Sequence, residues 1–196
     1  MNKQNILNKI KLNYNKCENC ALAKQGRKQV VFGQGNPNAN IMFIGEAPGK
    51  DEDIQGAPFV GRAGKLLIKM IEAIGYKRED AYISNVVKCR PPNNRTPLPN
   101  ETNVCKKLIL FKEIETINPK VICCLGASAT QALLGKDIKI SNSRGLFFNL
   151  NNIKIMPTFH PAYLLRNPKA KKQVCEDLEK INFYLENIKN RDNAEK

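Results

Sequence analysis

The 196-residue sequence contains no tryptophan, a single histidine and no apolar run that approaches the length of a membrane span. A transmembrane helix needs about 20 consecutive apolar residues, so no such helix is expected. The first residues, MNKQNILNKIKLNYNK, also lack the apolar stretch of a signal peptide. We therefore expect an intracellular, cytoplasmic protein.

Acidic residues are scarce relative to basic ones. The sequence has 18 Asp and Glu against 32 Lys and Arg, which gives a formal net charge of +14. Such a surplus is typical of proteins that bind polyanions, because each phosphate neutralised by a basic side chain releases condensed counterions. Basic proteins without a nucleic-acid partner are common, so the charge favours DNA or RNA without establishing it.

Seven cysteines in a reducing compartment indicate metal ligands or buried thiols rather than disulfides. Cys17 and Cys20 have the C-x-x-C spacing that lets two thiolates reach one metal from a single turn. Cys89 and Cys105 flank the proline-rich stretch RPPNNRTPLP and are their expected partners. The second C-x-x-C of a zinc ribbon is missing, so spacing leaves zinc, an iron–sulfur cluster and no metal at all open.

The other three cysteines are expected to be buried thiols. Cys123 and Cys124 are adjacent on a predicted strand, where side chains point to opposite faces, so both cannot bind one metal. Cys175 falls in a predicted C-terminal helix and is interpreted in the same way.

Short apolar runs alternate with helical patterns along the chain. Strands are predicted at 41–44, 82–87 and 120–125, and within GLFFNLNNIKIMPTF on both sides of Asn151 and Asn152. Helices are predicted at 2–15, 63–74, 100–117, 126–134 and 168–189. The pattern predicts an α/β fold, a three-layer α/β/α sandwich around a mainly parallel, four-stranded sheet. We expect one domain over residues 1–189 and a polar, disordered tail over residues 190–196.

The stretch GEAPGKDEDIQGAPFVGRAG, residues 45–64, follows the first predicted strand. It does not fit a phosphate-binding P-loop, because Gly45 and Gly49 enclose three residues instead of four and no Ser or Thr follows Lys50. Its four acidic residues would also repel a phosphate. The composition suits a pocket for a flat, neutral, polar ligand, and it equally suits a solvated Gly/Pro-rich turn.

Ligands of open α/β sheets bind beyond the carboxyl ends of the strands. Three loops are predicted to meet there, at 45–63, 88–99 and 160–168. With them come Asn85, at a strand end, and His160, the only histidine. The sequence therefore predicts one crevice that these loops share.

In this order, the motifs resemble family 4 uracil-DNA glycosylases, the iron–sulfur type within the uracil-DNA glycosylase superfamily. The resemblance runs from Cys17 to about Asn187 through CENC, GEAPGKDED, PFVGRAG, SNVVKCRPP and HPAYLLRNP. It implies an enzyme that releases uracil from single- or double-stranded DNA and leaves an abasic site, in base excision repair. We also expect a monomer.

The same resemblance implies that Cys17, Cys20, Cys89 and Cys105 hold a [4Fe–4S] cluster with a structural role. Two positions depart from the residues expected in such enzymes: Lys50 stands where an acidic residue is expected, and Ala57 where a larger or basic one is expected. Both departures lie in the variable part of the loop, so they concern local DNA contacts more than the chemistry.

Hydrolysis of an N-glycosidic bond needs a stabilised leaving base and a stabilised sugar cation. His160 is expected to donate a hydrogen bond to uracil O2, for which it need not be charged. Glu46 is expected to orient water toward C1′ and to stabilise the oxocarbenium ion. A lone histidine is more often structural, and that alternative stays open.

Base selection is assigned to Asn85, whose amide can accept from uracil N3–H and donate to O4, whereas cytosine offers the opposite pattern. Phe59 is expected to stack on the flipped base, and Glu52 to crowd C5 and exclude thymine. The backbone at Gly45, Ala47 and Gly49 is expected to approach the base or the water. Structural roles for Asn85 and Phe59 remain alternatives.

Flipping the base out of the helix leaves a gap that must be filled. The segment after His160 is interpreted as an apolar wedge for the minor groove, formed by Tyr163, Leu164, Leu165 and Arg166. The alternative is a buried turn of helix, which would account for Leu164 or Leu165 but hardly for both. Phosphate contacts are expected from Arg62, Lys65, Arg90, Arg95 and Arg144.

Two other functions compete with this interpretation. One is a non-catalytic nucleic-acid binder with a metal-stabilised fold. The other is a nucleotide hydrolase that binds Mg²⁺ through Asp51, Glu52 and Asp53. A monofunctional glycosylase is expected because no lysine in the motifs is an evident Schiff-base nucleophile, with Lys50 the one open point.

Overall fold

A six-stranded sheet in the order β1-β3-β2-β4-β6-β5 organises residues 2–194, the part of the chain that the computed structural model describes. Its centre is parallel and consists of β3 (Tyr82–Asn85), β2 (Ile41–Gly45), β4 (Val121–Leu125) and β6 (Ile153–Thr158). The edges β1 (Gln34–Gly35) and β5 (Phe148–Leu150) are antiparallel. The predicted α/β sandwich is confirmed, but the sheet has six strands instead of four. β1 is too short for its residues to carry a hydrophobic pattern.

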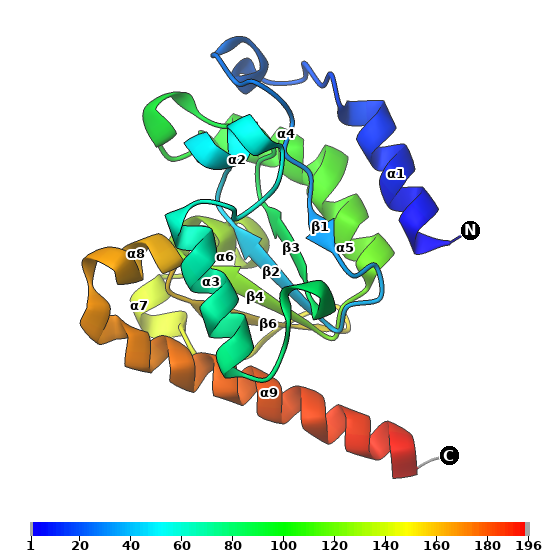
Figure 1. Cartoon of the computed structure of the whole chain (residues 1–196), viewed down its shortest axis with the longest axis vertical. Coiled ribbons are helices and arrows are strands. Elements are labelled where there is room, and N and C mark those ends of the chain that lie inside the picture. Colours follow the sequence, from blue (N-terminus) through cyan, green and yellow to red (C-terminus); the bar gives the residue numbers. More distant parts are fainter. Residues whose placement is uncertain (1, 195–196) are drawn as a thin grey trace.

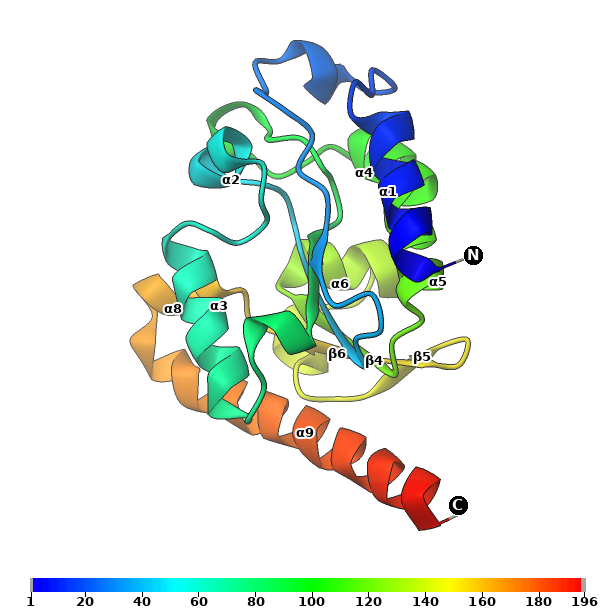
Figure 2. The ribbon, with the colours of Figure 1, turned by 45° about the vertical axis from the view of Figure 1, so that its right-hand side comes forward.

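Helices cover both faces of the sheet (Figures 1 and 2). One face is covered by α1 (Lys3–Tyr14), α4 (Pro99–Cys105), the π-helical η4 (Lys106–Leu110), α5 (Phe111–Ile117) and α6 (Ala127–Leu134). The other is covered by α3 (Arg62–Ala73), α8 (Pro161–Arg166) and α9 (Lys171–Ala194). Short elements connect them: α2 (Lys50–Gln55), α7 (Ile140–Ser143), η1 (Ala21–Lys24), η2 (Arg78–Asp80), η3 (Pro92–Asn94) and η5 (Pro168–Ala170).

Strand residues alternate between the two cores, as the period of two in a strand requires. Met42 and Ile44 pack toward α1 and α5, whereas Phe43 packs toward α3 and α9. Cys123 and Cys124 follow the same rule and are fully buried in opposite cores. They are therefore core residues that cannot share one metal.

The helix predicted at 100–117 is one continuous helical segment made of α4, η4 and α5. Pro99 occupies its first turn, and the carboxylate of Glu101 accepts a hydrogen bond from the N–H of Leu98. The segment ends where Asn118 adopts a left-handed conformation directly before Pro119.

The last helix is longer than predicted. α9 continues to Ala194. Residues 190–194 were expected to be disordered, but they are helical. Residues 195–196 lie outside the described part of the chain. No Gly or Pro interrupts this polar extension, which projects beyond the body in Figure 1. Within residues 2–194, no helix combines the length and apolar character needed to cross a membrane.

Candidate active site

A cavity of about 230 Å³ lies at the carboxyl ends of the central strands. Glu46, Ala47 and Phe59 line it from the loop after β2, Asn85 from the end of β3 and His160 from the end of β6. The structure thus brings together the five side chains that the sequence placed in a shared crevice.

Asn85 contributes an unusual polar atom to this cavity. The residue is 2% exposed, and its Oδ1 is buried without a hydrogen-bond partner among residues 2–194. An unpaired buried acceptor costs roughly 1–3 kcal/mol. A retained acceptor of this kind is suited to a ligand that donates an N–H group.

Two glycines let the loop close around Asn85 and Phe59. A Cβ on Gly45 would lie 2.5 Å from Asn85 Oδ1 and 2.5 Å from Phe59 Cζ. A Cβ on Gly64, in α3, would strike the carbonyl oxygen of Phe59. Phe59 itself has φ of 55°, a conformation that is rare and costly for a side chain of this size. The glycines and this strained backbone hold the ring at the cavity wall.

Glu46 is held by a residue that the sequence analysis missed. Ser128 Oγ, in the first turn of α6, donates a short hydrogen bond to Glu46 Oε2. Ser128 follows β4 directly, so the rule that ligands bind at strand carboxyl ends could have singled it out. The other carboxylate oxygen of Glu46, Oε1, is not bonded to Ser128.

His160 caps α8 and is thereby fixed in one tautomer. Its Nδ1 accepts a hydrogen bond from the N–H of Ala162 at 3.1 Å, so a neutral ring carries its proton on Nε2. Desolvation, aided by the positive charge of Arg166, lowers the pKa of His160 to about 4. The ring centroid lies 5.8 Å from that of Phe59. At neutral pH the site therefore holds an uncharged imidazole that can donate through Nε2–H.

Glu52 lines the cavity, but its carboxylate is occupied by the loop that carries it. Oε2 accepts from the N–H of Gly49, and Oε1 accepts from the N–H groups of Val60 and Gly61 at 3.0 and 2.9 Å. Glu52 therefore ties the two halves of the loop together, a role that the sequence analysis did not assign to it.

The segment after His160 forms α8, and one of its four predicted wedge residues is buried. Tyr163 and Leu165 are 38% and 40% exposed, and Arg166 is also exposed. Leu164 is 1% exposed and packs in the core beneath α8. The expectation that Leu164 is free to contact DNA is wrong for this structure, because a helical turn sends adjacent side chains in different directions.

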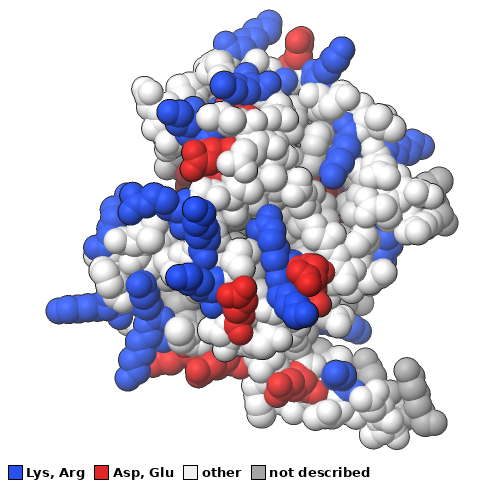
Figure 3. Space-filling model, viewed as in Figure 1, with Lys and Arg blue, Asp and Glu red and all other residues white. Residues whose placement is uncertain are grey.

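The predicted phosphate-binding residues divide into two groups. Arg62 and Lys65 are exposed on α3. Arg95 forms a two-point ion pair with buried Glu101, and Arg144 forms one with buried Asp177. Arg90 is bonded to Asn94. Figure 3 shows Lys and Arg side chains over the part of the visible face that carries α3 and α8, and others at its top and right.

Four cysteines line a second, small cavity. They are Cys17 and Cys20, both half-buried, and Cys89 and Cys105, both buried. The sequence predicted this set of four from spacing and resemblance, although they come from three separate segments. All seven cysteines are free thiols. Cys175 is exposed on α9, so the expectation that it is buried is wrong.

Arg27 reaches into the cysteine cavity and was missed by the sequence analysis. Its guanidinium donates to Cys89 Sγ at 2.7 Å and to the carbonyl of Cys17 at 2.6 Å. Desolvation raises the pKa of Cys89, against the opposing effect of Arg27, and raises the pKa of Cys105 to about 12.

No three His, Cys, Asp or Glu side chains among residues 2–194 converge closely enough to form a mononuclear metal site. Tetrahedral zinc, with Zn–S bonds of about 2.3 Å, requires closely convergent thiolates. The four cysteines nevertheless meet around one cavity, and thiolates are the ligands of both structural zinc and iron–sulfur clusters.

The three acidic residues proposed for Mg²⁺ do not converge. Asp53 is buried and accepts hydrogen bonds from the N–H of Lys28, while Asp51 is exposed. The carboxylate of Glu52 is bonded to loop N–H groups, as described above. The nucleotide-hydrolase alternative thus has no metal site in this loop.

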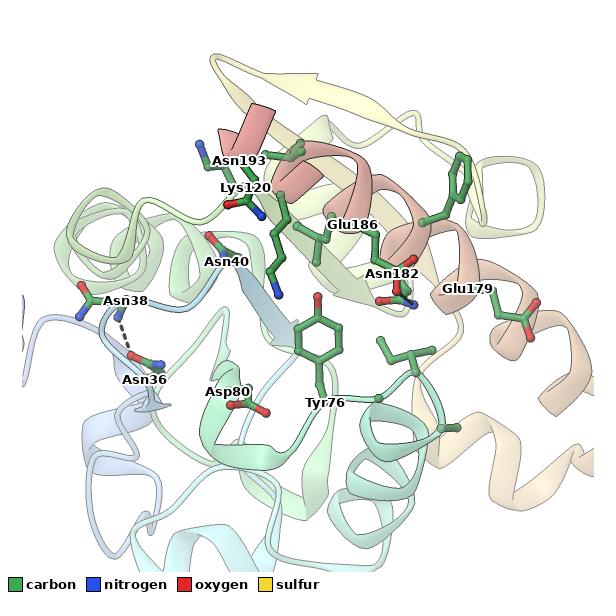
Figure 4. A pocket seen from close by; sticks show the side chains of 17 residues that line it. Asn36, Asn38, Asn40, Tyr76, Asp80, Lys120, Glu179, Asn182, Glu186 and Asn193 are labelled. Atoms are coloured by element: carbon green, nitrogen blue, oxygen red, sulfur yellow. Dashed lines mark hydrogen bonds between the residues drawn. The ribbon is translucent and has the colours of Figure 1, made fainter. Parts of the chain in front are cut away.

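A larger cavity, of about 1180 Å³, lies at the other end of the sheet between α9 and the loops before β2 and β4 (Figure 4). Asn40 and Lys120, which directly precede those strands, line it together with Tyr76, Asn182 and Glu186. Because ligands of such sheets bind at the carboxyl ends, and all the catalytic candidates lie there, size does not make this cavity the active site.

Comparison with known proteins agrees with the geometry. A sequence profile described as the uracil DNA glycosylase superfamily matches residues 32–186. A type-4 uracil-DNA glycosylase of Thermotoga maritima is 48% identical over 174 residues, 87% of this chain and 90% of its own length. Proteins of the same name from Saccharolobus solfataricus and Archaeoglobus fulgidus are 48% and 43% identical, over 87% and 84% of this chain and 82% and 86% of their own lengths.

Proposed function

The chain belongs to the uracil DNA glycosylase superfamily, and we propose that Glu46, Asn85 and His160 carry out its reaction. The reaction is hydrolysis of the N-glycosidic bond of deoxyuridine in DNA, which releases uracil and leaves an abasic site for repair. The observation that carries the residue assignment is the unpartnered Oδ1 of Asn85, buried in the cavity that Glu46 and His160 also line.

Asn85 selects the base. Its Oδ1 accepts from uracil N3–H, which removes the cost of an unpaired acceptor, and its Nδ2 donates to O4. Cytosine has an acceptor at N3 and a donor at N4, so it loses both bonds. The ring of Phe59 stacks on the base. Gly45 has no side chain and so leaves room for that ring. The backbone of Ala47 borders the same space.

His160 stabilises the departing base. A neutral imidazole with its proton on Nε2 donates a hydrogen bond to uracil O2 as negative charge develops there. Such a donor contributes mainly in the transition state, where the oxygen carries the most charge. The hydrogen bond from Ala162 supports this role because it fixes the ring orientation before substrate arrives.

Glu46 acts on the sugar side. Its carboxylate orients a water molecule toward C1′ and stabilises the oxocarbenium ion. Ser128 supports this role by holding Oε2 in place. Glu52 both shapes the loop and crowds the C5 position of the base, where a thymine methyl would lie. Its three loop hydrogen bonds make it a rigid wall for that purpose.

DNA is bound on the face that carries α3 and α8. Tyr163 and Leu165 fill the gap left by the flipped base, and Arg62 and Arg166 contact phosphates. Leu164 supports the wedge from the core instead of entering DNA. A monomer in the cytoplasm remains the prediction from the sequence.

The four cysteines hold a [4Fe–4S] cluster. Their residues fit the group, because four free thiols, the usual ligands of iron–sulfur clusters, come from three segments to surround one cavity. The cluster would cross-link the N-terminal segment to both ends of the 88–105 segment and so stabilise the wall of the active site. Arg27 compensates negative charge at Cys89.

The reaction is monofunctional. Among the described residues that line the active-site cavity none is a lysine, and Lys50 is exposed at the start of α2. A Schiff-base nucleophile is therefore missing from the cavity wall. The catalytic set also distinguishes the protein from a non-catalytic binder, which would not need Glu46, Asn85 and His160 in one cavity.

Incubation with uracil-containing single-stranded DNA in EDTA tests the function. We expect release of free uracil without strand cleavage and without added metal. The variants His160→Ala and Glu46→Ala should each lose activity by a factor on the order of 10² or more. Undiminished uracil release by both variants would refute the catalytic assignment. If freshly purified parent protein with the brown colour of an iron–sulfur cluster releases no uracil, the proposed function is refuted.

A further inference from the structure

A fully buried lysine lies directly behind the base-reading residue. The side chain of Lys88 is 0% exposed, and its ammonium contacts Glu113 Oε2 at 2.7 Å, Ser84 Oγ at 2.5 Å and the carbonyl oxygen of Asn85 at 2.6 Å. The second oxygen of Glu113 accepts from the N–H of Gly33. The ion pair is therefore fully hydrogen-bonded, but it does not line the active-site cavity.

Stability alone does not account for this pair. Taking two charges out of water is costly, and replacing a buried ion pair by apolar side chains of similar volume is often neutral or stabilising. The surrounding core already has apolar residues that such side chains could join, including Val87, Ile109 and Ile114. A buried pair retained at this position calls for a role that apolar packing cannot fill.

The contact with the Asn85 carbonyl supplies that role. The parallel ladder ends at Asn85, beyond which the N–H groups of Val86 and Val87 bond to the carbonyls of Gly45 and Glu46 at 2.9 and 3.1 Å. The ammonium of Lys88 holds the carbonyl of Asn85 itself. The position of the Asn85 side chain depends on this short stretch.

The same stretch reaches the cysteine cavity. The backbone N–H of Lys88 donates to Cys105 Sγ at 3.3 Å, and the next residue is Cys89. Lys88 thus contacts both sites: its backbone N–H bonds to Cys105, and its side chain bonds to the backbone carbonyl of Asn85. No other side-chain cation is bonded to Asn85 within residues 2–194.

We propose that the buried Lys88–Glu113 pair is a positioning device that fixes Asn85, and through it the recognition of uracil. The inference rests on the proposed function and adds two positioning residues to it. A positioning error of about 1 Å can lower a rate by a factor on the order of 10². Loss of the pair should therefore reduce base release more than it reduces DNA binding, which depends on surface charge.

The test is the double variant Lys88→Met/Glu113→Leu, which removes both charges and leaves neither one buried alone. We expect its single-turnover rate of uracil release to fall by a factor on the order of 10 to 10², with little change in affinity for uracil-free DNA. Iron content should stay close to that of the parent, whereas the midpoint of thermal unfolding should fall, because the Gly33 N–H, the Ser84 hydroxyl and the Asn85 carbonyl lose buried partners. An unchanged rate in the folded double variant would overturn the proposal.

A double-mutant cycle separates positioning of Asn85 from a general structural effect. In an Asn85→Ala background, the Lys88→Met/Glu113→Leu substitutions should lower the remaining rate by less than about twofold, because the residue they position is already gone. The same fold-loss in both backgrounds would overturn the proposal. A parent protein that releases no uracil would instead refute the proposed function.

Two further variants complete the experiment. Lys112→Met/Glu115→Leu makes the same charge change on the exposed face of α5 and should leave the rate unchanged. Should the buried double variant fail to fold, Ser84→Ala removes only one of the three contacts of the ammonium. It should lower the rate about threefold in the parent and not in the Asn85→Ala background. Equal losses in both would overturn the proposal.

Discussion

The hydroxyl of Ser128 donates a hydrogen bond to Oε2 of Glu46, which joins the first turn of α6 to the loop after β2. The two residues are 82 positions apart in the sequence. The carboxylate assigned to the sugar side of the reaction is therefore oriented by a neighbouring strand-to-helix connection as well as by its own loop.

Replacing Ser128 by alanine should lower the rate of uracil release about tenfold, because Glu46 loses the contact that fixes Oε2. Ser128→Thr, which keeps a hydroxyl, should retain more of the rate. Single-turnover kinetics on single-stranded DNA measures both. The exposed residue Ser141, on α7, provides the control Ser141→Ala, which should behave as the parent. Equal rates for Ser128→Ala and the control would show that Ser128 does not orient Glu46.

The neutral state of His160 can be observed directly because the chain has one histidine. Burial and the charge of Arg166 lower its pKa to about 4, so the ring should remain neutral at pH 6, with the proton on Nε2. NMR of the single imidazole should report that tautomer and a titration midpoint far below 6.5. A midpoint near 6.5 would contradict a desolvated, neutral donor.

The same shift has a consequence for stability. The native pKa of about 4 lies below the unfolded value of about 6.5, so the unfolded chain binds a proton more readily between these pH values. The contribution of His160 to the free energy of unfolding should therefore be complete above about pH 6.5 and lost as pH falls toward 4. In His160→Gln, denaturant titrations between pH 4 and 7 should show a weaker pH dependence than in the parent.

The cysteine site predicts which thiols are needed for iron. Alanine at Cys17, Cys20, Cys89 or Cys105 should lower bound iron and acid-labile sulfide and reduce thermal stability, because an open coordination position is exposed to water and oxygen. Analysis of anaerobically purified variants measures these quantities.

Three matched controls come from the remaining cysteines. Cys123→Ala and Cys124→Ala should keep iron while losing on the order of 1 kcal/mol from the buried cores, and Cys175→Ala, at the surface, should match the parent. Stoichiometric zinc without iron or sulfide in the parent would contradict a cluster.

Most of the fold could be predicted from the sequence, because buried parallel strands such as β2 and β4 are short, β-branched-rich runs between turns. The errors lie where local composition is a poor guide. α2 was not predicted in its Gly/Pro-rich loop, although Gly49 and Glu52 supply the cap of a six-residue helix. The predicted helix ends at residue 189 because the residues that follow are polar, but none of them breaks a helix and α9 continues to Ala194.

The candidate site was predictable only in part. Glu46, Asn85 and His160 stand at strand ends, where topology alone gathers them. Ser128, Arg27 and the Lys88–Glu113 pair act through contacts between distant segments, and no spacing in the sequence reveals such contacts. Residues that hold other residues in place are thus harder to find than those that meet the ligand.

Truncating the two adjacent leucines of α8 should cause different defects, one in activity on duplex DNA and the other in stability. Leu165→Ala, at an exposed position, should leave stability within about 0.5 kcal/mol but weaken uracil release from duplex DNA more than from single strands, since only a duplex must be wedged open. Leu164→Ala should instead cost about 2–5 kcal/mol of stability. Thermal unfolding and duplex-to-single-strand rate ratios measure the two effects. A duplex-specific defect in Leu164→Ala alone would reverse the assignment.

The base-reading role of Asn85 predicts an asymmetric result on substitution. In Asn85→Asp a carboxylate oxygen can still accept from uracil N3–H, but the second oxygen meets O4 with repulsion, so uracil release should fall. The buried site adds to this loss, because an ionised carboxylate would lie where the parent has a 2% exposed amide.

The same variant gains complementarity to cytosine, since the second oxygen can accept from N4–H₂ while N3 requires a protonated acid or base. Cytosine release should therefore appear weakly and rise as pH falls, whereas Asn85→Ala should lose uracil release without gaining cytosine. Single-turnover assays on matched uracil and cytosine strands at several pH values measure both. If Asn85→Asp releases uracil at the parent rate, the unpartnered Oδ1 does not read the base, and recognition must reside elsewhere in the cavity wall.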